Sequence, residues 1–236
     1  MRLWKAHASL VISLTLAISA SVLATTFLDD FSGMPAGSCY PDGSTIGAWQ
    51  FVYNGYGCNG FVAPNGNTML FEQPEVSTSP NETHASLAVG PYISGDFTLE
   101  LSAATGGQLR TNSAPNPWEV AWVLWHYTDD FHFYYFVAKP NGWELGKEDP
   151  AYPGAQRFLA SGTSPTFPIG TWYRARVTQS GQTIQVFVNN ALITTFTDRQ
   201  RPYTSGRVGL YNEDAEVYFD DVSVTTAVGG KPRKGH

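Results

Sequence analysis

The sequence has few charged residues, only two cysteines and a single long apolar run. Asp, Glu, Lys and Arg make up 14% of the 236 residues, and 20 acidic residues outnumber 14 basic ones, which gives a formal net charge of −6. An acidic chain lacks the Lys and Arg surface that neutralises phosphates, so the composition argues against nucleic acid as a partner. It also disfavours binding to anionic membrane surfaces.

The apolar run lies at the N-terminus and has the pattern of a secretory signal peptide. Arg2 and Lys5 precede an apolar stretch over residues 10–18, and residues 22–24 form a small-residue cleavage site. The stretch is shorter than the roughly 20 residues that span a bilayer. We expect residues 1–24 to be removed, which takes away two positive charges and changes the net charge from −6 to −8. The protein is then secreted or extracellular, with the periplasm and the cell surface as alternatives, and has no membrane partner.

The two cysteines, Cys39 and Cys58, form the whole cysteine content of the chain. An even number of cysteines in an exported protein predicts a disulfide bond. Such a bond, closing a short loop, stabilises the fold by roughly 3 kcal/mol. A metal pair is the alternative, although no histidine or further cysteine lies at ligand spacing.

Helical periodicity is absent, whereas alternation of apolar and polar residues recurs between Gly, Pro, Asn and Asp. Aromatic residues reach 14%, and 23 glycines and 15 prolines supply turns. The expected strands are 27–31, 68–73, 86–89, 97–103, 119–127, 131–139, 143–147, 156–160, 172–179, 183–188, 192–197, 207–211 and 217–224. About fourteen short strands predict an all-β fold, a two-sheet antiparallel β-sandwich or jelly roll. The domain spans 25–227, and 228–236 forms a flexible tail.

The last third of the chain resembles a known superfamily. The resemblance is carried by Gly170-Thr-Trp-Tyr-Arg-Ala-Arg-Val-Thr, Ile184-Gln-Val-Phe-Val-Asn-Asn, Gly206-Arg-Val-Gly-Leu-Tyr and Val217-Tyr-Phe-Asp-Asp-Val-Ser-Val, together with Phe27-Leu-Asp-Asp-Phe. These segments are similar to concanavalin A-like lectin and glucanase jelly rolls, in the laminin-G-like and 3-keto-disaccharide-hydrolase-like branch. The resemblance implies carbohydrate handling on the concave sheet, but not one particular chemistry.

The central strands can be divided into two faces, because alternate residues of a strand point to opposite sides. One set is apolar and is expected to face the core: Ala121, Val123, Trp125, Phe133, Tyr135, Val137, Trp143 and Leu145. The other set combines aromatic and titratable side chains: Trp118, Val120, Trp122, Leu124, His126, His132, Tyr134, Phe136 and Glu144. We interpret the second set as a sugar-binding face. A single bulge would invert this assignment, and a second core layer is a further alternative.

The chemistry on that face stays open between hydrolysis, elimination and binding alone. A glycosidase uses two carboxyl groups, and only Glu144 is well placed, since Glu148 would lie roughly 13 Å away along a strand. A lyase instead needs a base and groups that neutralise a uronate. The predicted catalytic residues are His126, Tyr134 and Glu144, and the predicted substrate-binding residues are Arg110, Trp118, Trp122, His132, Lys139 and Lys147.

Two acidic pairs near the ends of the chain predict a metal site. Asp29 and Asp30 lie in the first strand, and Asp220 and Asp221 lie in the last. Terminal strands of jelly rolls run side by side, so the carboxylates can meet and supply the oxygen ligands that Ca²⁺ prefers. The resemblance likewise implies a structural calcium ion. The alternative is that these acids guard an edge strand against aggregation or lie in turns.

The sequence therefore predicts a secreted, monomeric carbohydrate-active protein. It binds a polysaccharide or oligosaccharide, and whether it also cleaves it is left open. The alternative is a non-catalytic glycan-binding or laminin-G-like adhesion module.

Overall fold

A computed structural model describes residues 24–227 of the chain. Nearly all of the predicted signal peptide and the whole predicted tail lie outside the described residues. Among residues 24–227, no helix has the length and apolar character needed to cross a membrane.

The described chain is built almost entirely from strands, as the alternating pattern predicts. A short 3-10 turn, η1, covers Pro64–Gly66. The strands are β1 (Ala24–Asp29), β2 (Ser38–Cys39), β3 (Thr45–Ile46), β4 (Trp49–Tyr53), β5 (Cys58–Val62), β6 (Met69–Gln73), β7 (Ala85–Ser94), β8 (Phe97–Gln108), β9 (Ala121–Asp129), β10 (His132–Lys139), β11 (Gly142–Glu148), β12 (Gln156–Gly162), β13 (Tyr173–Ser180), β14 (Thr183–Val188), β15 (Ala191–Thr197), β16 (Ser205–Glu213) and β17 (Ala215–Ala227).

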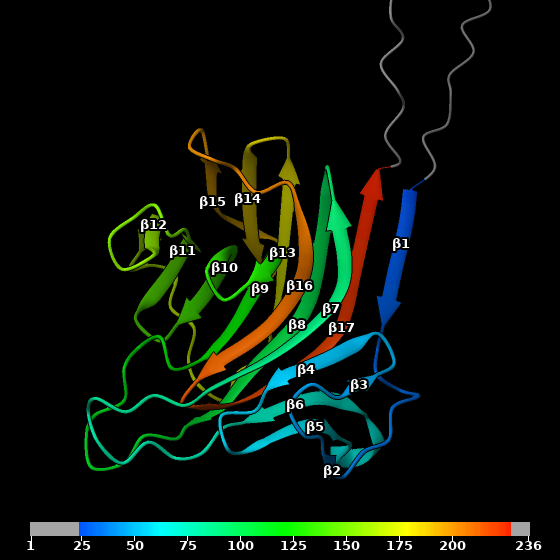
Figure 1. Cartoon of the computed structure of the whole chain (residues 1–236), viewed down its shortest axis with the longest axis vertical. Coiled ribbons are helices and arrows are strands. Elements are labelled where there is room, and N and C mark those ends of the chain that lie inside the picture. Colours follow the sequence, from blue (N-terminus) through cyan, green and yellow to red (C-terminus); the bar gives the residue numbers. More distant parts are fainter. Residues whose placement is uncertain (1–23, 228–236) are drawn as a thin grey trace, which may run out of the picture.

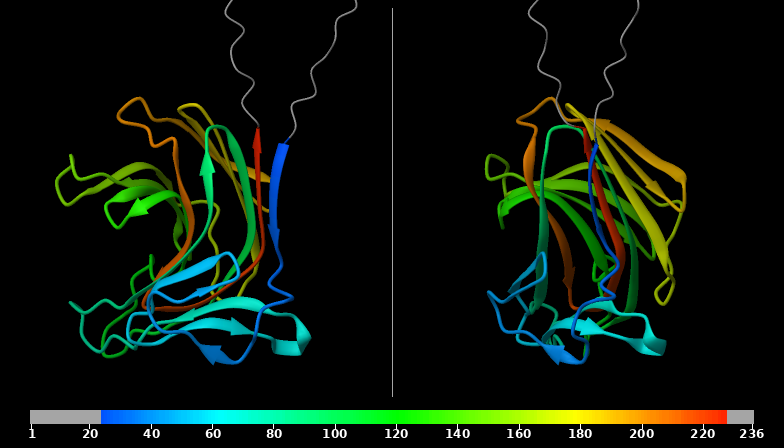
Figure 2. Two further views of the ribbon diagram at one scale, coloured as in Figure 1. Left: turned by 45° about the vertical axis from the view of Figure 1, so that its right-hand side comes forward. Right: turned by 90° about the vertical axis from the view of Figure 1, so that its right-hand side faces the viewer.

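The strands form two antiparallel sheets that face each other (Figures 1 and 2). One sheet has nine strands in the order β15-β14-β13-β8-β17-β6-β5-β2, with β1 also paired to β17. The other has eight strands in the order β12-β11-β10-β9-β16-β7-β4-β3. The predicted two-sheet β-sandwich is confirmed. Strands β2 to β6 gather at one end of the sandwich (Figure 1).

The core lies between the two sheets and follows the period of two in their strands. In β13, for example, Tyr173, Ala175 and Val177 are buried while the residues between them are partly exposed. The core continues across the sheets through large side chains such as Trp49 and Trp125, both completely buried. Burial of apolar surface on this scale provides the main favourable free energy of folding.

The predicted disulfide bond is present and joins Cys39 to Cys58 across a separation of 19 residues. It links β2 to β5, which are neighbours at the edge of the nine-stranded sheet. This part of the chain contains the short strands β2 to β5, which the sequence pattern did not resolve. The disulfide bond therefore stabilises a segment whose short strands make few backbone hydrogen bonds.

A bulge in β9 changes the expected faces of the central hairpin. His126 has a positive φ of 53°, and the register of β9 with β10 shifts between Trp125 and Asp129. Beyond the bulge, Trp125 pairs with Tyr134 and Trp122 pairs with Val137. Directly paired residues share one face, so β10 turns Tyr134 and Phe136 to the core. Its other residues, Phe133, Tyr135 and Val137, lie on the outer face, so the sequence-based assignment of this whole strand was inverted. The backbone of Gly206 approaches His126 so closely that a Cβ would lie 2.3 Å from its carbonyl carbon.

Candidate functional site

The outer face of the eight-stranded sheet carries a second apolar cluster, separate from the core. Its buried members come only from this sheet and the residue before it: Leu87, Val89, Val120, Trp122, Leu124, Phe133, Tyr135 and Val137. Tyr53, Tyr127 and Tyr211 pack against the cluster at its margin. An outer sheet face is ordinarily polar, but the members of this aromatic-rich layer are at most 9% exposed. The layer is therefore a second core under the surface, the alternative that the sequence left open, rather than a bare apolar patch.

Three adjoining depressions run across this face, and we call them together the outer groove. The first holds about 360 Å³ and is lined by Trp118, Trp122, Lys139, Glu144, Gln156, Phe158 and Glu213. The second, of about 380 Å³, shares Trp122, Gln156 and Glu213 with it. The third, of about 420 Å³, continues from the second through Tyr127 and reaches Arg207. A groove of this extent suits a chain-like ligand better than a single small molecule.

Trp122 forms the centre of the groove floor, and its ring is fixed by neighbours on both sides. The ring centre of Trp122 lies 4.9 Å from that of Tyr135 and 5.3 Å from that of Tyr211. Its indole Nε1 donates a hydrogen bond of 2.7 Å to the backbone oxygen of Trp118. Its only donor is engaged and the side chain is 5% exposed, so Trp122 supports the groove floor and offers little surface of its own to a ligand.

A polar cluster lies beside this floor and centres on Glu144. The hydroxyl of Tyr135 donates to Glu144 Oε1 at 2.9 Å, and Lys139 Nζ lies 2.9 Å from Oε2. Gln156 Nε2 donates to the Tyr135 hydroxyl oxygen at 3.0 Å. The site of Gly146 leaves room for that hydroxyl, since a Cβ there would lie 2.2 Å from it. Burial, followed by the charge of Glu144, raises the pKa of Tyr135, so the phenol stays protonated and acts as a donor.

Four of the predicted site residues line the groove together. Trp118, Trp122, Lys139 and Glu144 all surround the first depression. Trp118 is 44% exposed at the rim, whereas the Lys139–Glu144 ion pair is only slightly exposed. The interpretation of Trp122 and Glu144 as members of one face agrees with this arrangement. Their roles in binding or catalysis stay predictions.

The structure does not bring His126 and Tyr134 to the groove, and their placement beside Glu144 was wrong. Tyr134 is completely buried in the core, where its hydroxyl donates to Asp198 at 2.7 Å. His126 is 1% exposed, and its ring centre lies 5.2 Å from that of Phe97. Burial lowers the pKa of His126 to about 4, so its ring is neutral at pH 7. The bulge explains the error for His126, because it resets the alternation after Trp125. The error for Tyr134 follows from the pairing of β10, which sets Tyr134 opposite the core residue Trp125.

Lys147 also lies away from the groove, in a buried ion cluster. It is completely buried, and its Nζ lies 2.8 Å from Asp198 Oδ2 and 3.4 Å from Asp149 Oδ2. The same nitrogen donates to the backbone oxygens of Gln200 and Arg201. Lys147 therefore joins β11 to the segment after β15 rather than facing a substrate.

Arg110 and His132 likewise have partners outside the groove. Arg110 is buried, with its Nε 2.7 Å from Glu119 Oε1 and its Nη2 2.6 Å from Asp214 Oδ2. These bonds fix the turn between β16 and β17 to the loop before β9. His132 lies exposed at the β9–β10 turn, where its Nδ1 is 2.7 Å from Asp129 Oδ1. Neither side chain lines the groove, so the predicted contacts to substrate do not follow from their positions.

Two further acids in the groove were not selected from the sequence. Glu148, at the end of β11, and Glu213, at the end of β16, both line the second depression. The sequence pattern had placed Glu148 too far from Glu144 and had not selected Glu213. Only the pairing of β9 with both β10 and β16 brings these acids to one cavity. No local pattern signals such a long-range pairing.

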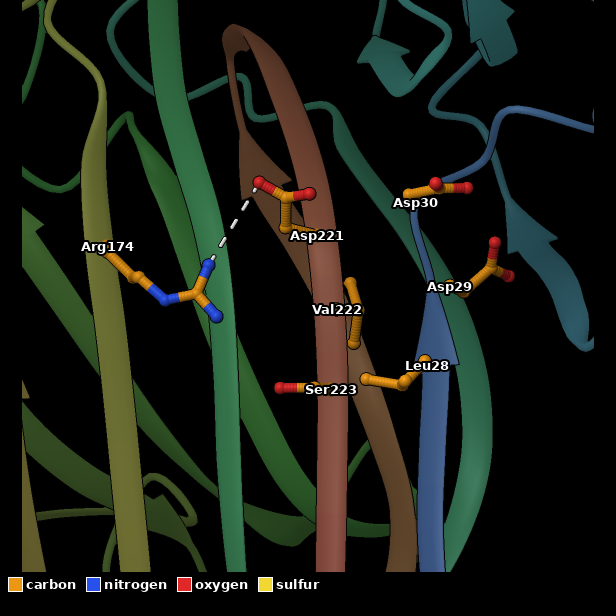
Figure 3. A pocket seen from close by; sticks show the side chains of 7 residues that line it. All are labelled: Leu28, Asp29, Asp30, Arg174, Asp221, Val222 and Ser223. Carbon is orange, nitrogen blue, oxygen red and sulfur yellow. Dashed lines mark ion pairs between the residues drawn. The ribbon is translucent and has the colours of Figure 1, made fainter.

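The acidic pairs at the two ends of the described chain do lie on neighbouring strands. β1 pairs with β17, and Asp29 stands opposite Val222. Asp29, Asp30 and Asp221 line a cavity of about 480 Å³ with Arg174 (Figure 3). Arg174 Nη1 lies 4.0 Å from Asp221 Oδ2. Asp220 is oriented by Asn67, whose Nδ2 donates to Asp220 Oδ2 at 2.8 Å.

Some carboxylate oxygens of these acids already accept hydrogen bonds from the protein. Asp29 accepts hydrogen bonds from the backbone N–H of Phe31 and from Trp49 Nε1, each at 2.9 Å. Among residues 24–227, no cluster of three or more His, Cys, Asp or Glu side chains is arranged to hold a metal ion. The proximity of the strands agrees with the reasoning from the sequence, and calcium stays a prediction.

A model of one protein family matches most of the chain. The family is described as the 3-keto-alpha-glucoside-1,2-lyase-like domain, and the match covers residues 40–225. These residues include all strands of the outer groove. Among curated proteins none matches the chain.

Solved structures with the same architecture include three of bacterial origin. The carbohydrate binding module CBM66 from Bacillus subtilis is 16% identical, with a TM-score of 0.54 over 79% of this chain and 100% of that one. A protein of unknown function with a galectin-like fold from Bacillus subtilis is 12% identical, with a TM-score of 0.54 over 84% and 100%. The GlcNAcα1-4Gal-releasing endo-β-galactosidase from Clostridium perfringens is 12% identical, with a TM-score of 0.52 over 92% and 66%. At sequence identities this low, the structural similarity establishes a shared fold alone.

Proposed function

The chain belongs to the 3-keto-alpha-glucoside-1,2-lyase-like domain family, and on this basis we propose that it binds a carbohydrate chain in the outer groove. The family description concerns a glucoside, and two of the similar structures are described as carbohydrate-binding or galactoside-releasing proteins. We assign this groove to the concave ligand surface that the resemblance to jelly-roll lectins implies.

One observation supports the proposal above the others: aromatic rings flank a compact polar cluster in the first depression. Trp118 is 44% exposed and Phe158 is 62% exposed, and Lys139, Glu144 and Gln156 line the same depression. A sugar ring has apolar C–H faces and a rim of hydroxyl groups. Aromatic surface next to a few fixed donors and acceptors matches both parts of such a ligand.

The length of the groove supports an oligosaccharide or polysaccharide as the ligand. The three depressions adjoin one another from β12 to β4, across the direction of the strands. Each holds about 360 to 420 Å³. Several sugar units can therefore occupy the face in sequence, and contacts at each unit add to the affinity.

We further propose that the protein acts outside the cytoplasm as a monomer. The N-terminal sequence has the pattern of a signal peptide. The disulfide bond between Cys39 and Cys58 suits an oxidising compartment. Fractionation of the native host, with detection by antibody, tests this location, and light scattering of the purified protein tests the monomer.

Retention on immobilised glycans tests the binding function. The panel comprises cellulose, xylan, mannan, galactan and chitin as uncharged glycans, and alginate and pectate as acidic ones. We expect retention on at least one uncharged glycan, and its elution by fragments of the same glycan. Retention on none of the panel would contradict the proposal and favour an adhesion module that contacts protein.

A further inference from the structure

The second depression of the groove contains two carboxyl groups that the binding function does not use. Glu148 stands opposite Phe133 of β10 and Gln156 of β12 in the strand ladders. Phe133 belongs to the outer apolar cluster, so the side chain of Glu148 is on the same face. Glu213 lies two residues beyond Tyr211, whose ring packs on Trp122, and it therefore faces the groove as well.

Both acids lack a basic partner among the described residues 24–227. The nearest cations are engaged elsewhere: Lys139 pairs with Glu144, and Arg110 pairs with Glu119 and Asp214. The one polar side-chain contact of Glu213 is the hydroxyl of Tyr211, which donates to its Oε1 at 2.8 Å. A structural carboxylate this enclosed would ordinarily be neutralised by an ion pair.

The surroundings raise the pKa of both groups, and the raised pKa of Glu148 depends in part on the charge of an ionised Glu213. Burial, followed by the charge of Glu213, raises the pKa of Glu148 to about 7. The groups that face Glu148 from β10 and β12, Phe133 and Gln156, carry no charge. Burial also raises the pKa of Glu213; the Tyr211 hydrogen bond and Arg110 oppose this, while Asp214 and Glu119 add to it. A carboxyl group whose pKa is raised to about 7, with a second acid in the same cavity, can exchange a proton with a ligand near neutral pH.

We propose that Glu148 and Glu213 are the acid and base that hydrolyse a glycosidic bond of the glycan held in the outer groove. Glu148 gives its proton to the glycosidic oxygen as the bond from that oxygen to the anomeric carbon breaks and its electron pair stays on the oxygen. Glu213 takes a proton from a water molecule, whose oxygen forms the new bond to the anomeric carbon. One water is consumed, two hydroxyl groups form, and the proton returns from Glu213 to Glu148 through solvent. This inference depends on the proposed glycan-binding function.

The charge of the groove indicates the class of glycan. Asp130, Glu144, Glu148 and Glu213 line the first two depressions, against Lys139 as the one base among their lining residues. Such a lining repels polyuronates and favours uncharged sugars or amino sugars. An elimination reaction on a uronate is therefore the less suitable chemistry for this site. Hydrolysis of a neutral glycan requires only the two acids and water.

The experiment uses the full mature chain and any glycan from the panel that retains it. New reducing ends are measured for the wild type, Glu148→Gln, Glu213→Gln and the control Glu75→Gln. Glu75 is an exposed carboxyl outside the groove. Loss of an acid or base catalyst costs about 10²–10⁴-fold in rate. We expect losses of that size in both groove variants, with retention on the glycan within about threefold of wild type, and an unchanged rate for the control.

Each result separates this inference from the binding function. Retention without any release of reducing ends would overturn the hydrolase and leave the binding function in place. Ultraviolet-absorbing unsaturated products would overturn it in favour of elimination. Retention on no glycan would overturn both proposals. If a variant does not fold, as judged by circular dichroism, the wild-type pH profile decides: kcat/KM must fall as the pH rises above about 7, and a flat profile would count against Glu148 as the acid.

Discussion

Lys139 Nζ and Glu144 Oε2 lie 2.9 Å apart in the wall of the outer groove. Because the Tyr135 hydroxyl occupies the other carboxylate oxygen, Glu144 is held in one orientation and its charge is balanced. A fixed, neutralised pair of this kind can accept and donate hydrogen bonds to hydroxyl groups without attracting a counter-ion. It is therefore better suited to orienting a neutral sugar than to exchanging protons with it.

Removing the indole of Trp118 is expected to weaken glycan binding without affecting the fold. Trp118 is 44% exposed at the rim of the first depression, and loss of an aromatic contact residue typically costs about 2 kcal/mol or more of binding free energy. Trp118→Ala should therefore raise Kd by at least about tenfold in isothermal titration with the retained glycan. Trp172 is equally exposed but outside the groove, so Trp172→Ala is the control. Equal effects of the two substitutions would contradict the placement of the site.

Arg110→Met is expected to destabilise the protein strongly. It leaves Glu119 and Asp214, which are 1% and 0% exposed, without their basic partner. Breaking a buried ion pair in this way costs about 3–5 kcal/mol of unfolding free energy, measurable by urea denaturation. Arg174→Met is the control, because Arg174 pairs with Glu100 at an exposed position, where such pairs contribute only about 0–1 kcal/mol. A small effect of Arg110→Met would restore Arg110 as a candidate for contact with substrate.

Opposite to His126, whose pKa burial lowers to about 4, Glu148 is expected to lower the stability of the protein as the pH rises from 4.5 to about 7. Burial and Glu213 raise its pKa from 4.5 to about 7 in the folded state. Within this window the folded protein retains a proton that the unfolded chain releases, so rising pH favours unfolding. Glu148→Gln removes this contribution, and its melting temperature relative to the wild type should increase as the pH rises from 4.5 to 7. A difference that is constant with pH would contradict the raised pKa.

Removal of the disulfide bond is expected to destabilise the end of the sandwich that contains β2 to β6. The loop closed by Cys39 and Cys58 spans 19 residues, and chain-entropy arithmetic gives roughly 3 kcal/mol for a loop of this length. The double variant Cys39→Ala/Cys58→Ala should lose about this amount in urea denaturation. Unchanged stability would show that the packing of this segment suffices without the covalent link.

Chelation tests the predicted calcium ion. Burial, together with the charges of Asp221 and Asp30, raises the pKa of Asp220, and a divalent cation at this position would offset the repulsion among these acids. We expect EGTA to lower the melting temperature and added Ca²⁺ to restore it, and Asp221→Asn to remove the response. A melting temperature that is the same with and without chelator would contradict the predicted calcium site.

Much of the fold is predictable from local sequence, because strand positions and tight turns depend on neighbouring residues. The dipeptide Asn141-Gly142 indicates the turn between β10 and β11, and it connects them in the structure with Lys139 opposite Gly142. The short strands before Phe61 are harder to find, since each has few residues and the disulfide bond supports them.

The candidate site depends on relationships that no local pattern contains. A bulge decides the face of His126, and the pairing with Trp125 decides the face of Tyr134; the alternation of apolar residues marks neither. Glu148 and Glu213 meet because β16 joins the sheet beside β9, after more than seventy intervening residues. Trp122 and Glu144 were placed on the correct face because β9 up to Trp125 and the start of β11 alternate regularly.

The pairing of β1 with β17 also bears on how this domain can be engineered. Ala24 stands opposite Ala227 in that ladder, so both ends of the described chain leave the sandwich from adjacent positions (Figures 1 and 2). A short Gly/Ser connection could close the backbone into a ring, and new termini could be opened at the exposed turn around Gly181. The same geometry allows the sandwich to be inserted into a surface loop of a host protein, with the groove-bearing sheet left free to display its ligand.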